Sequence, residues 1–333
     1  MDVDAFVAVR SERWRRMEQL TSTRVRDLDG AGADELIAFY QASTTDYSRV
    51  RTRVPDPGVV SRLSRLLSRG RSLLSGAHEP AWSDVTRFFG ISLPAAFYRV
   101  RWWTFAMMMA FIVIGVLSGW WALANPEVMA LFGTPESRRQ YAERAFEAYY
   151  SEFPAQDFAG MVWTNNSWIS AQAIAMGITG IGPIYVLSVN AISVGQAGAV
   201  MIDHDMTEVF FGLILPHGML ELTAIFVACG AGLKLFWAGV SPGPRTRGRA
   251  LAREGRSLIT LVLGLALVLA VSAIIEGFVT PSGLPGAVKI AIGALALALY
   301  WVYALTLGRI AARDGETGDM RAEHQEDTFA TVD

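Results

Sequence analysis

Three long stretches with almost no charged residues constrain the fold of this chain more than any other feature of its sequence. They are Ile112–Leu123, Leu258–Ile275 and Ile290–Leu307. Each lies in an apolar run close to the about 20 residues that a helix needs to cross the hydrocarbon core of a bilayer. We therefore expect an all-α protein, a polytopic bundle of membrane helices held in the lipid bilayer.

The N-terminal part, residues 1–101, is polar and lacks the alternation of a strand. Apolar residues recur there at helical spacing, and Pro55-Asp56-Pro57-Gly58 is a strong turn signal. We expect a cytoplasmic region of three or four short helices, ending at the membrane interface in 82–101, where aromatic residues accompany arginine. The basic amphipathic stretch 59–74 is either a packed helix with a solvated arginine face or a helix lying on anionic lipid. Because residues 1–30 are rich in charge, we expect no cleavable signal peptide.

The composition and charge of the chain exclude several classes of function. The formal net charge is −2, so no global positive field attracts nucleic acid, and we expect no nucleic-acid partner. The single cysteine, Cys229, excludes an intrachain disulfide and a cysteine-based zinc site. The glycines between Gly177 and Gly198 do not form a nucleotide loop, because no strand precedes them and no Gly-Lys-Ser/Thr follows. Their spacing instead predicts close helix packing, and no cofactor is expected.

Charge bias predicts the orientation. The loop 237–257 carries five arginines against one acid, and Arg309 and Arg313 flank the last apolar run. The positive-inside rule places these regions, and with them both termini, in the cytoplasm. The loop 125–163 is then external. The return through the apolar but interrupted region 164–236 needs an odd number of crossings, and its breaks predict three short or kinked segments.

The transmembrane domain is thus expected over 102–307, with about six segments, some of them broken or re-entrant. They lie at about 104–124, 165–181, 183–201, 207–236, 258–276 and 286–307. The alternative has five segments, with one interrupted piece re-entrant. The acidic remainder, 308–333, is expected to be a disordered cytoplasmic tail.

Two ionisable residues interrupt the third of the broken segments. His217 and Glu221 are four residues apart and share one face of a helix. Ionisable groups are costly at membrane depth, so we expect both to face the bundle or a water-filled cavity. One interpretation is a hydrogen-bonded pair packed against Asn165, Asn166 or Asn190; the other is a site for an ion, a proton or a ligand. His-x-x-x-Glu has metal-ligand spacing, but no third ligand is assured, so we predict no metal site.

The same region carries a family likeness. An Asn165-Asn166 pair opens an apolar segment, glycines follow, and the likeness ends in Pro216-His217-Gly218-Met219-Leu220-Glu221-Leu222-Thr223-Ala224. This pattern resembles the stage II sporulation protein M family, whose members carry an Asn-Asn pair and a Pro-His-Gly-x-x-Glu-Leu-x-Ala signature. The likeness covers about residues 95–307, and the family's Asn-Gly appears as Asn190-Ala191. The motif and intramembrane polar residues are Asn165, Asn166, Asn190, Pro216, His217, Gly218 and Glu221.

The resemblance implies a multi-pass protein of the bacterial cell membrane that is not an enzyme and has no catalytic residues. The founding member of the family acts in endospore engulfment, where it holds peptidoglycan hydrolases at the septal membrane. We accordingly expect a scaffold that recruits protein partners, with peptidoglycan hydrolases as the partners that the resemblance implies. The alternative is a transporter or channel subunit, favoured by the broken helices and by His217 and Glu221 within the membrane.

Overall fold

Helices make up every regular element that a computed structural model describes for this chain, as the sequence predicts. The described residues are 3–22, 30–53, 56–74 and 82–319. The chain divides into two compact units, Met1–Ser83 and Asp84–Asp333. We call them the N-terminal unit and the membrane unit.

Among its described residues, the N-terminal unit is built mainly from three helices: α1 (Val3–Ser22), α2 (Gly30–Arg53) and α3 (Pro57–Leu74). α3 buries Leu63 and Leu66 against the other two helices, because its leucines recur every three to four residues along one side. This burial favours the packed-helix interpretation of the basic amphipathic stretch over a helix lying on lipid. The buried core residues are Phe6, Trp14, Met17, Leu20, Leu36, Val50, Leu63 and Leu66.

Asp46 of α2 lies inside this core, with 3% of its side chain exposed. Its Oδ1 accepts a hydrogen bond from Nε of Arg10 at 3.0 Å, and its Oδ2 accepts one from Nε1 of Trp14 at 3.1 Å. Arg13 donates to the same carboxylate. A buried carboxylate without such partners would be strongly unfavourable, so these contacts hold α1 against α2.

The membrane unit begins with an unbroken helical run of 41 residues, Asp84–Ala124. It contains the end of α4 (Trp82–Arg87), the π-helical turn η2 (Phe88–Ser92) and α5 (Leu93–Ala124). The two compact units therefore divide at 83/84 and not at the expected 101/102. The reason is that the expected interfacial end continues directly into the first apolar helix.

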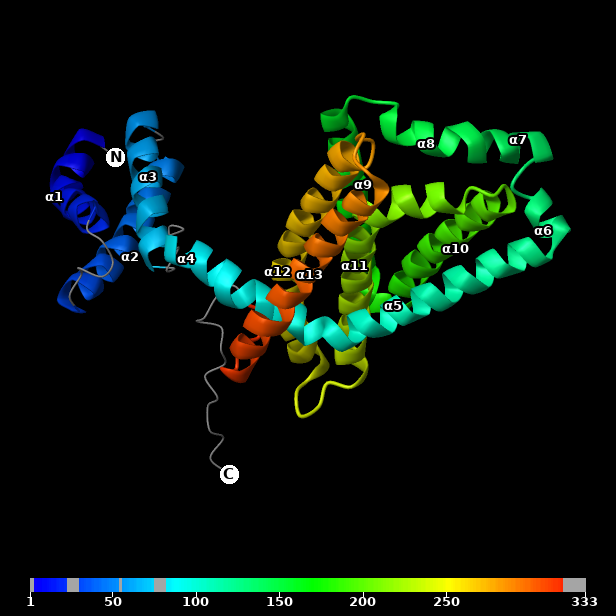
Figure 1. The fold of residues 1–333 in the computed structure, drawn as a ribbon. Coiled ribbons are helices and arrows are strands. Elements are labelled where there is room, and N and C mark those ends of the chain that lie inside the picture. Colours follow the sequence, from blue (N-terminus) through cyan, green and yellow to red (C-terminus); the bar gives the residue numbers. More distant parts are fainter. Residues whose placement is uncertain (1–2, 23–29, 54–55, 75–81, 320–333) are drawn as a thin grey trace. The chain divides into compact units, whose positions relative to one another are not determined.

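Five helical runs within the described residues are long and apolar enough to cross a membrane. They are Asp84–Ala124, α10 (Ile181–Asp203), α11 (Thr207–Val240), Arg247–Val279 and α13 (Gly286–Arg313). The fourth run consists of α12 (Arg247–Ile274) and the π-helical turn η6 (Ile275–Val279). These helices form the polytopic all-α bundle that the sequence predicts (Figure 1).

Another long helix, α9 (Ala155–Ala175), packs against α11 and α12 but is more polar than these five runs. Its 21 residues correspond to about 31 Å, at 1.5 Å per residue. That length matches the about 30 Å thickness of a bilayer core. α9 begins at 155 and not at the expected 165, so the expected external loop 125–163 is corrected to end at 154.

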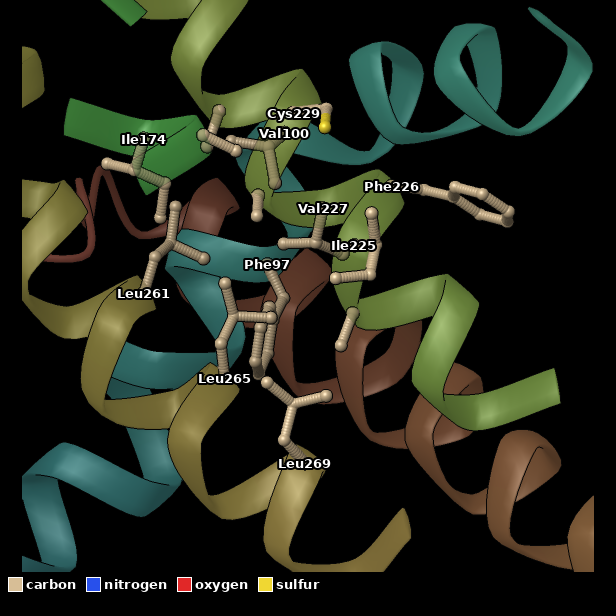
Figure 2. Close-up of a cluster of buried hydrophobic side chains, with 14 of the residues drawn as sticks. Phe97, Val100, Ile174, Ile225, Phe226, Val227, Cys229, Leu261, Leu265 and Leu269 are labelled. Atoms are coloured by element: carbon tan, nitrogen blue, oxygen red, sulfur yellow. The ribbon is translucent and has the colours of Figure 1, made fainter. Parts of the chain in front are cut away.

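The core of the membrane unit lies where α5, α11 and α12 meet. In Figure 2, Leu265 and Leu269 of α12 lie beside Phe97 of α5, and Leu261 lies near Ile174 of α9; all of these side chains are buried. The leucines repeat every four residues, so they form one stripe along α12. The opposite side of α12 exposes apolar side chains, as expected for a helix that faces lipid.

Glycines let the helices of the membrane unit approach one another closely. A β-carbon on Gly177 would stand 2.6 Å from Cα of Gly232, and one on Gly195 would stand 2.3 Å from the carbonyl oxygen of Gly115. No side chain fits at such contacts, which confirms the predicted packing role. Gly180 has a φ of 72°, a left-handed conformation that favours glycine and ends the helical path before α10.

Residues 125–154, which we call the cap segment, join α5 to α9 and lie across one end of the membrane unit (Figure 1). Ala142, Phe146 and Tyr150 recur every four residues and are buried. They pack with Phe158 of α9 and Phe210 of α11. The helical pieces of the cap segment are α6 (Pro126–Ala130), α7 (Pro135–Gln140), η3 (Tyr141–Ala145), α8 (Phe146–Ala148) and η4 (Tyr149–Ser151).

The C-terminal part departs from the disordered tail expected over 308–333. α13 continues as a helix to Arg313, and residues 314–319 pack on α5 and α12. The hydroxyl of Thr260 on α12 donates to the carbonyl oxygen of Gly318 at 2.7 Å. Such partners for the backbone hold this stretch in place. The rest of the expected tail lies outside the described residues.

Candidate functional site

The Pro-His-Gly string lies in the first part of α11. His217 stands about 15 Å along the helix axis from Thr207, at 1.5 Å per residue. Pro216 has no backbone N–H, so the carbonyl group one turn earlier lacks its usual helical donor. The hydroxyl of Ser272 on α12 donates to the carbonyl oxygen of His217 at 3.1 Å. His217 is 6% exposed, so its side chain faces the interior of the bundle.

A second acid completes a cluster with the predicted pair. Glu276 comes from the turn η6 and is 4% exposed. Its Oε1 lies 3.8 Å from Nε2 of His217. One ligand atom from each of His217, Glu221 and Glu276 lies within 4.8 Å of the other two. Two acids and an imidazole at such distances can bind a cation or share a proton.

Neighbouring side chains orient this cluster. Nδ1 of His217 lies 3.3 Å from the hydroxyl oxygen of Thr280, which follows η6. The side chain of Asn166 on α9 interacts with the carboxyl group of Glu221. The cluster therefore joins α9, α11 and the end of the α12 run, three elements that are distant in sequence.

Tyr150 of the cap segment covers the cluster. Its ring centroid lies 5.7 Å from that of His217. Burial raises the pKa of the Tyr150 phenol well above its usual range, and the nearby carboxylates of Glu276 and Glu221 raise this pKa further. The Tyr150 hydroxyl is therefore neutral at physiological pH.

The structure brings some of the predicted motif residues together and leaves others apart. Asn166 faces Glu221, whereas Asn165 is exposed. The side-chain amide of Asn190 donates to the carbonyl oxygen of Val186 in its own helix at 2.8 Å. Asn190 therefore stabilises α10 locally and is not a partner of the cluster.

Pro216 and Gly218 shape the backbone around the cluster. Pro216 is buried against Gly293 of α13, where an added β-carbon would stand 2.0 Å from the Pro216 carbonyl oxygen. Gly218 is buried too, and a β-carbon there would meet Ile214 of the same helix at 3.3 Å. Both motif residues thus serve close packing of α11.

Glu276 and Thr280 were not among the predicted site residues. Lys289, which lies across the outer turn from Glu276, is not its partner in the structure: Nζ of Lys289 donates to the carbonyl oxygen of Thr280 at 2.7 Å. The signal available in the sequence was that Glu276 is the acid that ends an otherwise uncharged apolar run, Leu258–Ile275.

A second charged group lies between α5, α11 and α12, away from this cluster. Glu254 accepts from Nη2 of Arg99 at 2.6 Å and from Nζ of Lys234 at 2.5 Å. These three residues line a cavity of about 350 Å³ together with Trp103, Trp237 and other residues. The ion pairs neutralise charge that would otherwise be buried unpaired.

Sequence comparison assigns the membrane unit to a known family. The stage II sporulation protein M family matches residues 108–281, more than half of the chain. The chain belongs to this family. The match contains every motif residue from Asn165 to Glu221 as well as Glu276 and Thr280. The stage II sporulation protein M family is not a known enzyme family.

The N-terminal unit has a match of its own. A domain of unknown function (DUF8413) matches residues 4–76, which include all of α1 but its first residue, together with α2 and α3. This family member therefore combines a membrane unit of the stage II sporulation protein M type with a separate helical domain. Comparisons with curated proteins and with solved structures find no match.

Proposed function

We propose that this protein is a non-enzymatic scaffold of the bacterial cell membrane that recruits partner proteins through the outer face of the cap segment. The observation that carries the proposal is the two-sided character of that segment. Phe146 and Tyr150 are buried in the bundle, whereas Glu143 and Glu147 are exposed. A segment anchored on one side presents an ordered surface on the other, which lowers the entropy lost on binding.

The charge of the cap segment indicates the kind of partner surface. Residues 125–154 contain five acids and three arginines, so their net charge is 3 − 5 = −2. A partner with a basic patch complements this surface. The family resemblance adds that the partners are cell-wall remodelling enzymes, with peptidoglycan hydrolases as the expected class.

The proposed orientation puts the cap segment outside the cell and both termini in the cytoplasm. It follows from the five arginines of 237–257 and from six crossings, with α9 as one of them. Parallel alignment of α9 with α11 supports that crossing, because Asn166 faces Glu221 and Gly177, just after α9, meets Gly232. A reporter fused at Gly248 is expected inside the cell, and an external signal there would refute this orientation.

A crosslinked pull-down from native membranes, read by mass spectrometry, tests the scaffold. The full chain is expected to recover extracytoplasmic peptidoglycan enzymes, and the double variant Glu143→Lys, Glu147→Lys is expected to lose them. Glu12→Lys, a charge reversal at an exposed position of the N-terminal unit, is the matched control and should retain them. Equal recovery by the cap variant and the control would contradict recruitment through the cap segment.

A second candidate function is transport, favoured by the buried group of His217, Glu221 and Glu276. Ionisable groups at membrane depth commonly line ion or proton pathways. Flux through proteoliposomes that is abolished by Glu221→Gln, with the protein still folded, would support transport. Unchanged flux relative to empty vesicles leaves the scaffold as the better account.

A further inference from the structure

Hydrogen bonding determines which ring nitrogen of His217 carries the proton. The hydroxyl of Thr280 donates to the carbonyl oxygen of Ile275 at 3.4 Å. The same hydroxyl oxygen therefore accepts from Nδ1–H of His217, at 3.3 Å. With its proton on Nδ1, a neutral imidazole carries a lone pair on Nε2. Nε2 lies 3.8 Å from Oε1 of Glu276.

The contact between Nε2 of His217 and Oε1 of Glu276 is not a hydrogen bond. The two atoms are 3.8 Å apart, beyond the range of such bonds. The Oε2 atoms of Glu221 and Glu276 are also buried and lack a hydrogen-bond partner. Three electron-pair donors thus converge on one buried point, where unpaired polar atoms are unfavourable.

We propose that His217, Glu221 and Glu276 bind one divalent transition-metal ion of the zinc class. One imidazole and two carboxylates form a ligand set suited to such ions. Tetrahedral bonds of about 2.0–2.1 Å separate ligand atoms by about 3.4 Å. The observed separations are 3.8 Å for one pair of ligand atoms and up to 4.8 Å within the group. Small side-chain rotations would shorten them to about 3.4 Å.

The surroundings match a metal site in a second respect. Metal-binding histidines usually donate their other ring N–H to a fixed acceptor, and ligating carboxylates are supported by hydrogen-bond donors. Thr280 supplies the acceptor for His217. Asn166 supplies an amide beside Glu221. The ion would tie the end of the α12 run to α11 and α9 beneath the cap segment.

A proton shared between the two carboxyl groups is the alternative to a metal ion, and it provides a partner for fewer of the polar atoms in the cluster. One proton between Glu221 and Glu276 neutralises one charge but leaves Nε2 of His217 without a partner. A divalent ion neutralises both carboxylates and accepts the imidazole lone pair. The inference is independent of the scaffold proposal, because it assigns a ligand to the interior of the bundle and not to the cap surface.

The test is the metal content of the full chain, purified in detergent with a tag that contains no histidine and without chelator. Elemental mass spectrometry is expected to find about one zinc-class ion per chain. Glu276→Gln, which keeps the side-chain shape, is expected to lose it. Glu208→Gln, at an exposed acid of the same helix α11, is the matched control and should retain the ion.

A second measurement covers the case in which Glu276→Gln fails to fold. Wild-type protein is stripped with a chelator and refilled with Zn²⁺ or Co²⁺. Zn²⁺ is expected to raise the thermal midpoint again, and Co²⁺ to give visible bands of a tetrahedral ion. Asn166→Ala and Thr280→Val are expected to weaken Zn²⁺ binding about 10–100-fold. Folded wild-type protein that carries no metal and responds to neither ion would overturn the proposal in favour of the shared proton.

Discussion

Gly293 of α13 lies directly against the backbone of Pro216 on α11. A β-carbon built on Gly293 would stand 2.0 Å from the Pro216 carbonyl oxygen and 2.9 Å from its Cα. The residue that lacks an N–H in α11 is thus covered by the residue that lacks a side chain in α13. This contact sets how closely α13 approaches the helix that carries His217 and Glu221.

Gly293→Ala is expected to destabilise the membrane unit. The new methyl group meets backbone atoms, which cannot move aside as a flexible side chain can, and overpacking of this kind typically reduces stability by about 1–3 kcal/mol. Thermal unfolding in detergent measures the effect. Gly286→Ala, at the open first turn of the same helix, is the control; equal midpoints for the two variants would contradict the close contact.

Glu254→Gln is expected to be more destabilising than Lys234→Gln. Removing Glu254 leaves Arg99 and Lys234 as two partly buried cations without their counterion, whereas removing Lys234 leaves the Arg99 pair intact. Loss of one partner from a buried pair typically reduces stability by about 3–5 kcal/mol. Denaturation curves of both variants give the ranking. The exposed pair of Glu136 and Arg139 provides the comparison, since Glu136→Gln should change little.

Trp14→Ala is expected to loosen the N-terminal unit strongly. Trp14 is fully buried and donates to Asp46, so the substitution creates a cavity and removes a hydrogen bond. Large aromatic-to-alanine changes in a core typically reduce stability by about 3–5 kcal/mol. Hydrogen exchange of residues 3–74 in the full chain should accelerate. Trp82→Ala, at an indole that is 84% exposed, should leave exchange unchanged.

Alkaline pH is expected to release the cap segment. Burial raises the pKa of Tyr150 above 10.0, with a further contribution from Glu276 and Glu221. Below about pH 10 the phenol is neutral in both states, and its contribution to stability is fully present. Above that pH the unfolded segment ionises first, so this stability is lost as pH rises. Tyrosinate absorbance should show a late-titrating group that Tyr150→Phe removes.

The fold class and two members of the buried cluster, His217 and Glu221, could be predicted from the sequence, because both depend on local features of the chain. Uncharged apolar runs as long as Leu258–Ile275 avoid water only as buried or lipid-facing helices. The four-residue spacing of His217 and Glu221 puts both on one face of α11 whatever surrounds it. Because charged groups are unfavourable in lipid, this face is predicted to turn toward the interior of the bundle. The structure agrees with the helical spacing and with this inward orientation.

The third member of the buried cluster, the dividing point at 83/84 and the end of α13 depended on the tertiary structure. Glu276 and Lys289 are both near the outer turn in sequence, and nothing local decides which of them turns toward α11. That choice depends on how α12 rotates when its leucine stripe packs on Phe97 and Ile225. Local spacing determines which side chains share a helix face, but only the packing of distant helices determines which faces meet.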